Sequence, residues 1–148
     1  MYFTHKSIIV GDDADMEKNS ISSALSDYLE AIYVLSLKFP AVRITDVAKK
    51  LGISKPSANR AVKSLKQEGY VLHEPYGDII LTQKGNDFGK AAYAKRMTVK
   101  KFLTDVLGID EEEANREACM IVHTMSEETL ERLEKYMNEQ ERIIFSAV

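Results

Sequence analysis

Apolar residues recur every three or four positions along the first part of the chain, and this spacing predicts amphipathic helices. The first predicted helix covers residues 23–37 and the second covers residues 44–51, ending at Gly52. The third begins after Ser54, a residue type that caps helix N-termini, and ends at Gly69. Because so few residues separate the second and third helices, we expect them to cross at a tight turn.

After Gly69 the apolar period falls to two, which predicts a small β-hairpin with strands over residues 70–74 and 78–81. The helical period then returns. Further helices are predicted over residues 82–107, over residues 111–123 and after Ser126. Gly85 and Gly89 are expected to weaken the first turns of the long helix. The predicted fold is mainly α: an N-terminal winged helix-turn-helix with a small β-hairpin wing, followed by an all-helical domain.

The chain divides into four predicted segments. Residues 1–20 form a mobile tail, residues 21–83 the winged helix-turn-helix, residues 84–137 the helical domain and residues 138–148 a C-terminal extension. The extension ends in Ile143, Ile144 and Phe145, which either pack on a partner subunit or belong to a disordered end. We find neither a membrane span nor a signal peptide, and the single cysteine suits a reducing compartment, so we expect a cytoplasmic protein.

The charges are unevenly distributed along the chain, although the net charge is only −3. Residues 40–107 hold 13 Lys and Arg against 6 Asp and Glu, whereas residues 108–148 hold 4 against 11. The basic part therefore suits a polyanionic partner such as DNA. The acidic part suits a cation or a second copy of the chain, or else consists simply of solvated helix faces.

The polar face of the third helix carries hydroxyl, amide and cationic groups, which bond phosphates and base edges in DNA. We expect Ser54, Ser57, Asn59 and Arg60 to contact bases or nearby phosphates. Lys55, Lys63 and wing residues near Tyr76 are expected to hold phosphates. The full set of predicted DNA-binding residues is Arg43, Ser54, Lys55, Pro56, Ser57, Asn59, Arg60, Lys63 and Tyr76. Double-stranded DNA is the predicted partner, read by a homodimer because operators of such modules are usually two-fold symmetric.

Two spaced pairs bring metal-ligating side chains together. Asp27 and Glu30 lie three apart on the first helix, and Cys119 and His123 lie four apart on the acidic helix. Each pair alone is weak evidence, because cysteine is among the most often buried residue types and commonly serves packing.

From about Ser26 to Leu133 the chain resembles the diphtheria toxin repressor and manganese transport regulator family of metal-dependent transcriptional repressors (DtxR/MntR-like). The matching runs are Asp27-Tyr28-Leu29-Glu30-Ala31-Ile32-Tyr33, Ile44 to Gly69, Ile80-Leu81-Thr82 with Lys84-Gly85, and Glu117-Ala118-Cys119 with His123 and Met125-Ser126. The resemblance implies a homodimeric repressor of metal-uptake genes, with dimerisation and metal binding in the helical domain. It implies a bound divalent ion, Fe²⁺ or Mn²⁺, and places ligands at Asp27, Glu30, Cys119 and His123; Co²⁺ or Zn²⁺ also suits this ligand set.

Four positions depart from the family pattern, because Arg96, Lys100, Asn115 and Val122 stand where similar proteins carry histidines or carboxylates. Cationic side chains at such positions repel a second metal ion, which argues against a two-metal cluster and leaves one metal site per subunit. In an alternative reading, Arg96 pairs with Asp27 or Glu30 and replaces the metal, and the protein is then a metal-independent winged-helix regulator with a degenerate site.

Other classes fit the sequence less well. In an enzyme, Cys119 would be the nucleophile and His123 its base, but no third residue orients the histidine and no glycine-rich oxyanion loop is near. We therefore expect no enzyme and no small-molecule substrate. A winged helix that binds protein and has no affinity for DNA stays open, and it would lack the salt dependence of duplex binding.

Overall fold

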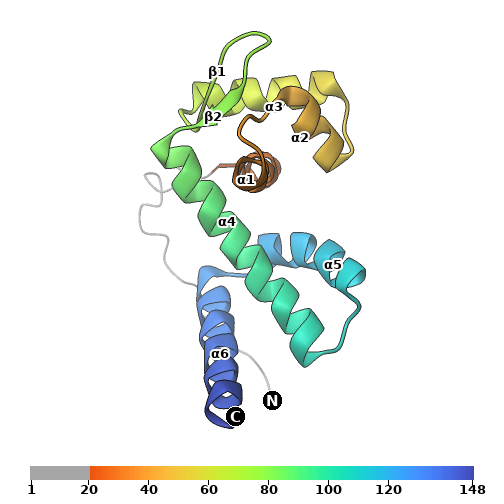
Figure 1. Cartoon of the computed structure of the whole chain (residues 1–148), viewed down its shortest axis with the longest axis vertical. Coiled ribbons are helices and arrows are strands. Elements are labelled where there is room, and N and C mark those ends of the chain that lie inside the picture. Colours follow the sequence, from red (N-terminus) through yellow and green to blue (C-terminus); the bar gives the residue numbers. More distant parts are fainter. Residues whose placement is uncertain (1–20) are drawn as a thin grey trace, which may run out of the picture.

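The computed structural model describes residues 21–148, and its helices and strands follow the predicted order (Figure 1). The elements are α1 (Ser23–Lys38), α2 (Ile44–Leu51), α3 (Lys55–Gln67), β1 (Val71–His73), β2 (Ile79–Leu81), α4 (Gln83–Lys101), the π-helical segment η2 (Phe102–Val106), α5 (Glu111–Thr124) and α6 (Glu127–Ser146). The mainly α class with one small antiparallel hairpin is confirmed. The tail predicted for residues 1–20 lies outside the described residues.

The turn between α2 and α3 has the predicted caps. Gly52 has a φ of 64°, the left-handed conformation that glycine adopts without a steric penalty. The backbone N–H of Ile53 donates to the carbonyl of Ala48 at 3.0 Å, which closes the end of α2. At the start of α3, the Ser57 N–H donates to Oγ of Ser54 at 3.2 Å. These bonds fix the angle at which α3 leaves α2.

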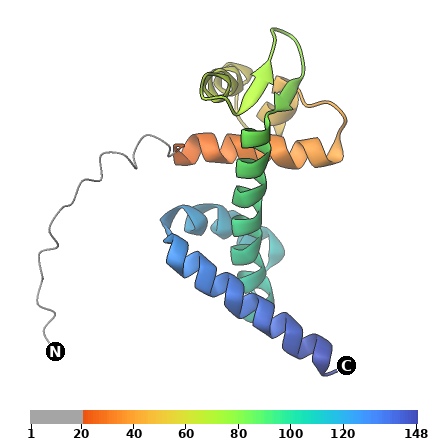
Figure 2. The same cartoon turned by 90° about the vertical axis from the view of Figure 1, so that its left-hand side faces the viewer.

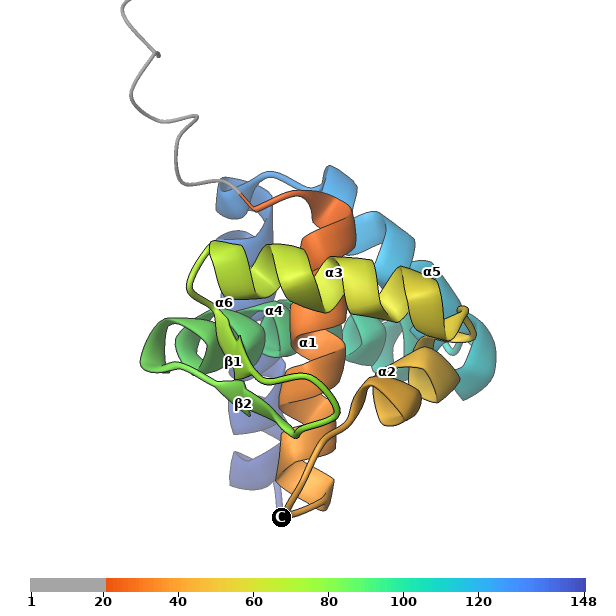
Figure 3. The ribbon, with the colours of Figure 1, turned by 90° about the horizontal axis from the view of Figure 1, so that it is seen from above.

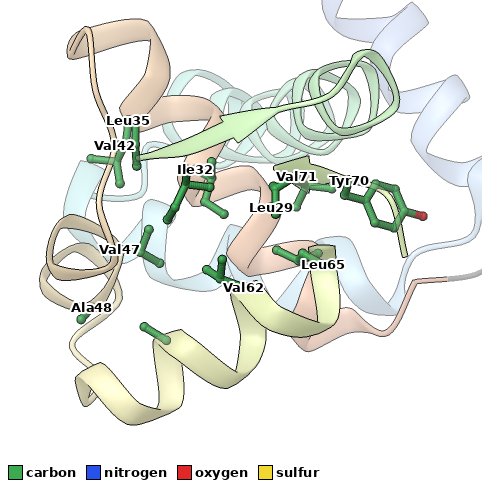
Figure 4. Close-up of a cluster of buried hydrophobic side chains, with 12 residues drawn as sticks. Leu29, Ile32, Leu35, Val42, Val47, Ala48, Val62, Leu65, Tyr70 and Val71 are labelled. Carbon is green, nitrogen blue, oxygen red and sulfur yellow. The ribbon is translucent and has the colours of Figure 1, made fainter. Parts of the chain in front are cut away.

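The core of the winged domain forms around α1, with side chains from every element of the domain (Figure 4). Leu29 and Ile32 of α1, Val47 of α2, and Val62 and Leu65 of α3 are completely buried. Burial of this apolar area is the main force that holds α3 in place on α1.

The hairpin lies beside α3 when the molecule is viewed from above (Figure 3). Its strands pair antiparallel with Val71 opposite Leu81, and each strand is shorter than predicted. Nζ of Lys66 on α3 donates to the carbonyl of His73 at 2.7 Å, which joins α3 to the wing. Tyr76 at the tip has a φ of 61°, unusual for a residue with a side chain.

Helix α4 runs from the winged domain into the second domain and crosses α1 on its way (Figure 2). The crossing is close at Gly89, where an added Cβ would lie 2.7 Å from Cβ of Tyr33. At Gly85 an added Cβ would lie 1.9 Å from the carbonyl oxygen of Tyr70. Both glycines, which we expected only to weaken the helix, therefore permit tight packing of α4 on its neighbours.

The second domain consists of the C-terminal half of α4, η2, α5 and α6. Its small core contains Val99, Leu103, Ala114, Ala118 and Leu130. Helix α6 continues to Ser146, so most of the predicted extension is helical. No helix among residues 21–148 is long and apolar enough to cross a membrane.

Candidate nucleic-acid interface and metal centre

Helix α3 exposes one polar face at the end of the molecule farthest from α6 (Figure 1). Ala58 and Val62 are completely buried on the opposite side. The residues exposed on the outer face include Lys55, Pro56, Asn59, Arg60 and Lys63, all among the predicted DNA-binding residues. Three of these five are cationic, so the face suits contact with phosphates.

A short hydrogen-bond chain orients the start of this face. The Ser54 hydroxyl donates to Oγ of Ser57 at 2.9 Å, and Nη2 of Arg60 donates to the same Ser57 oxygen at 3.2 Å. Ser54 therefore serves as the helix cap and as a positioning group for Ser57. The Arg60 guanidinium keeps its remaining donors for another partner.

Two further predicted contacts, Arg43 and Tyr76, lie outside α3 and its N-cap. Nε of Arg43 is 3.3 Å from Oδ1 of Asp78, the residue before β2, and both side chains remain well exposed. Tyr76 is fully exposed at the wing tip. The structure thus places Arg43, Tyr76 and the α3 face on the winged domain, and their contact with DNA stays a prediction.

Two of the four predicted metal ligands contact each other across the domain boundary. Nε2 of His123 on α5 lies 2.7 Å from Oδ1 of Asp27 on α1. The His123 side chain is 27% exposed and that of Asp27 48%. A nitrogen and an oxygen that face one another in this way are a pair of groups that a divalent cation can bind.

The third predicted ligand, Glu30, is already bound by a cation of the protein. The Arg96 guanidinium donates from Nε to Oε1 of Glu30 and from Nη1 to Oδ1 of Asn115, the second bond at 2.7 Å. We did not expect Asn115 as an acceptor for Arg96. Asn115, Cys119 and His123 follow one another at intervals of four residues, so they share one face of α5. This spacing is the signal that places Asn115 beside the predicted ligands.

The fourth predicted ligand, Cys119, lies one turn before His123 on α5 and is exposed as a residue. Burial of the thiol raises the pKa of Cys119, the positive charge of Arg96 opposes this shift, and the carboxylates of Glu30 and Asp27 reinforce it. The protonated thiol is therefore favoured in the metal-free protein.

The four residues fit a metal ion only in part. Within residues 21–148, no three His, Cys, Asp or Glu side chains gather closely enough to hold a metal as they stand. Asp27 and His123 present ligand atoms to each other, whereas the ion pair with Arg96 occupies Glu30. Lys100 is likewise paired, with Oε1 of Glu111 at 3.0 Å. The metal-ligand set remains a prediction for Asp27, Glu30, Cys119 and His123.

A winged helix-turn-helix followed by a helical domain is the architecture of a class of DNA-binding regulators. The model of the iron dependent repressor N-terminal DNA binding domain matches residues 20–79, and that of the iron dependent repressor metal binding and dimerisation domain matches residues 82–142. The chain belongs to this family, the DtxR/MntR-like metal-dependent repressors. It is therefore a member of a family of transcriptional regulators and not of enzymes.

Named relatives agree with this assignment. The chain is 40% identical to an uncharacterised HTH-type transcriptional regulator of Methanocaldococcus jannaschii, over 79% of this chain and 94% of the relative. It is 30% identical to the HTH-type transcriptional regulator MntR of Geobacillus kaustophilus, over 80% of this chain and 86% of that protein. The solved structure of the manganese regulator SloR matches with a TM-score of 0.68 and 32% identity, over 77% of this chain. The match covers 53% of the SloR chain, about half its length.

Proposed function

We propose that this protein is a transcriptional regulator that binds a two-fold symmetric operator in double-stranded DNA as a homodimer. The observation that carries the proposal is the exposed face of α3 with Asn59, Arg60 and Lys63, set on a buried core. Repression of metal-uptake genes is the role that we infer from the family. The protein would act in the cytoplasm, where this DNA lies.

Dimerisation is supported by apolar surface on the helical domain. Phe102, Ile121 and Leu133 line an apolar groove between α4, α5 and α6. At the end of α6, Ile143, Ile144 and Phe145 are 60%, 64% and 79% exposed. A second copy that covers such surfaces would set the distance between two α3 helices, which must match half-sites about 34 Å apart or a multiple of this.

Salt dependence of duplex binding tests the DNA-binding function. Fluorescence anisotropy with a duplex selected from a random pool should give a logarithm of affinity that falls linearly with the logarithm of salt concentration, because phosphate contacts release counterions. A winged helix that binds only protein would show no saturable duplex binding at any salt concentration. That result would exclude our proposal.

We also propose that a divalent metal ion regulates this DNA binding. Asp27, Cys119 and His123 would hold the ion, with Glu30 as the fourth ligand only if Arg96 releases it. The family favours iron or manganese, and a thiolate with an imidazole also suits cobalt or zinc. When bound, the ion would supply a positive charge that links α1 to α5. The facing atoms of Asp27 and His123, 2.7 Å apart, support this proposal.

A cobalt titration tests the metal site directly. Purified apo-protein titrated with Co²⁺ under reducing conditions should develop a saturable thiolate-to-cobalt charge-transfer band, and a Cys119→Ser variant should lack it. Duplex affinity is measured in the same samples. A band that persists in the variant would remove Cys119 from the ligand set.

A metal-independent regulator is the second candidate, and the ion pair between Glu30 and Arg96 favours it. In that case Co²⁺ would produce no charge-transfer band. Duplex affinity would be the same with and without metal, while the salt dependence would remain.

A further inference from the structure

One side chain of α4 joins three helices that come from both domains. The Arg96 guanidinium donates to the carboxylate of Glu30 on α1 and to the amide oxygen of Asn115 on α5. The Arg96 side chain is 14% exposed and that of Glu30 is 10% exposed. Glu30 is the one charged residue that is buried among residues 21–148. A cation that belongs to the chain therefore lies at the junction between the domains.

This ion pair hinders a metal ion from using Glu30. A buried carboxylate needs a bonded cation or hydrogen-bond donors, and Arg96 already supplies them. A divalent ion would have to displace the guanidinium or lie beside it, and like charges repel strongly in a partly buried site. Lys100, one turn further along α4 and 17% exposed, adds a second fixed positive charge to the same helix.

The contact between Asp27 and His123 differs from the ion pair of Arg96 with Glu30, because it is more accessible to solvent. These two side chains are bonded to each other at 2.7 Å and are more exposed than Glu30. A cation from solvent can therefore reach them without displacing a buried ion pair. The domain junction thus has one contact made by a fixed cation and one contact that a metal ion can change.

We propose that Arg96 is a built-in substitute for a metal ion. It ties α1 to α4 and α5 in the metal-free protein, so the protein binds DNA well without metal. A divalent ion adds only an increment, through Asp27 and His123. This inference rests on the proposed DNA-binding function and states how that function is regulated.

Three variants test the role of Arg96. Arg96→Met removes the guanidinium while keeping an unbranched apolar chain, and Arg96→Lys keeps the charge without the two-armed geometry. The double variant Glu30→Gln with Arg96→Met leaves no buried charge unpaired, so it folds even if the single variant does not. Arg116→Met is the matched control, because Arg116 is 63% exposed, pairs with Glu113 on the same helix and lies outside the apolar groove.

Duplex affinity is measured by anisotropy in EDTA and in saturating MnCl₂. The wild type should bind no more than about tenfold more weakly in EDTA, near the lower end of usual coupling between two sites. Arg96→Met, or the double variant, should bind about tenfold more weakly than the wild type in EDTA. The affinity of Arg96→Lys should lie between those of the wild type and Arg96→Met, and Arg116→Met should match the wild type.

Two results would overturn the inference. The first is equal affinity of Arg96→Met and wild type in EDTA. The second is a wild type that binds duplex more than about tenfold more weakly in EDTA than in MnCl₂. DNA binding would then depend on metal, and Arg96 would not replace the ion.

Hydrogen exchange of the metal-free proteins separates this inference from the DNA-binding function. If the wild type binds no duplex under either condition, the proposed function fails, yet exchange still reports on Arg96. If Arg96→Met loses amide protection in α1 and α5 while the control variant keeps it, the result supports the proposal that Arg96 replaces a metal ion. Unchanged protection overturns it.

Discussion

Nε2 of His123 lies 2.7 Å from Oδ1 of Asp27, so a side chain of the acidic helical domain contacts the first helix of the winged domain. Helix α1 carries Asp27 and also packs against α3. A change at this contact therefore has only α1 to cross before it reaches the proposed DNA-binding face. The proposed metal ion at the domain junction would therefore lie one helix away from α3.

Arg60 and Lys63 should differ in what they contribute to DNA binding. Arg60→Ala should lose about 1–3 kcal/mol of binding free energy and relax preference at one base, because a guanidinium can bond guanine in two places. Lys63→Ala should weaken binding to all sequences alike and flatten the salt slope by about one unit. Anisotropy with a selected and a random duplex measures both. Equal losses on the two duplexes for Arg60→Ala would exclude base recognition by that residue.

Replacement of Tyr76 at the wing tip by glycine should weaken DNA binding without lowering the stability of the protein. Tyr76 has a φ of 61°, and a non-glycine residue pays about 1 kcal/mol there, so Tyr76→Gly should not lower the free energy of unfolding. The same change should weaken duplex binding, since the exposed ring is lost. Urea unfolding and anisotropy measure the two quantities, and Tyr76→Asn serves as a control that tolerates this conformation. Unchanged affinity would mean that the tip does not reach DNA.

Gly89 should resist replacement even though alanine favours helices. Alanine gains about 1 kcal/mol in helix propensity, but its Cβ would lie 2.7 Å from Cβ of Tyr33, and overpacking typically costs about 1–3 kcal/mol. We therefore expect Gly89→Ala to lower the melting temperature. Ala94→Gly, at an exposed position of the same helix, calibrates the propensity term alone. A stabilised Gly89→Ala variant would contradict the close crossing of α1 and α4.

The thiol of Cys119 should react slowly near neutral pH. Its pKa is raised by burial, so the thiolate, which is the reactive form, becomes abundant only above the usual range for cysteine. Alkylation of the metal-free protein by iodoacetamide, followed by mass spectrometry, gives the rate at each pH. Arg96→Met removes the charge that lowers this pKa and should move the midpoint higher still. A midpoint at or below that of glutathione would contradict the partial burial of the Cys119 thiol.

Local signals in the sequence were sufficient for the helices, the turn and the wing. The change of apolar period after Gly69, together with caps at Ser54 and Gly52, reports interactions within a few residues, and these signals are read directly from the chain. The closeness of Gly89 to Tyr33 depends on how two distant helices cross. That information is not contained in either helix alone, so the glycines were interpreted only as weak points.

The sequence names the side chains that meet at the domain junction, but it does not determine how they pair. The sequence named Arg96 as a possible partner of Asp27 or Glu30, and the structure has it on Glu30. The choice depends on the rotation of α4 about its axis and on the position of Asn115, which provides the second acceptor. Both are tertiary properties that the spacing of residues does not determine.

Helix α4 is continuous from the winged domain into the helical domain, so a tilt of this helix moves one domain relative to the other. The helix holds 19 residues and is therefore roughly 28 Å long, and it is clamped to α1 near its start, at Gly89. The far end of α4 lies 12 residues beyond Gly89, roughly 18 Å along the axis, so a tilt of about 10° around that clamp would displace this end by about 3 Å. In a dimer joined at the far end, the same small tilt would instead move both winged domains. The spacing of the two recognition helices can thus respond to very small changes at the domain junction.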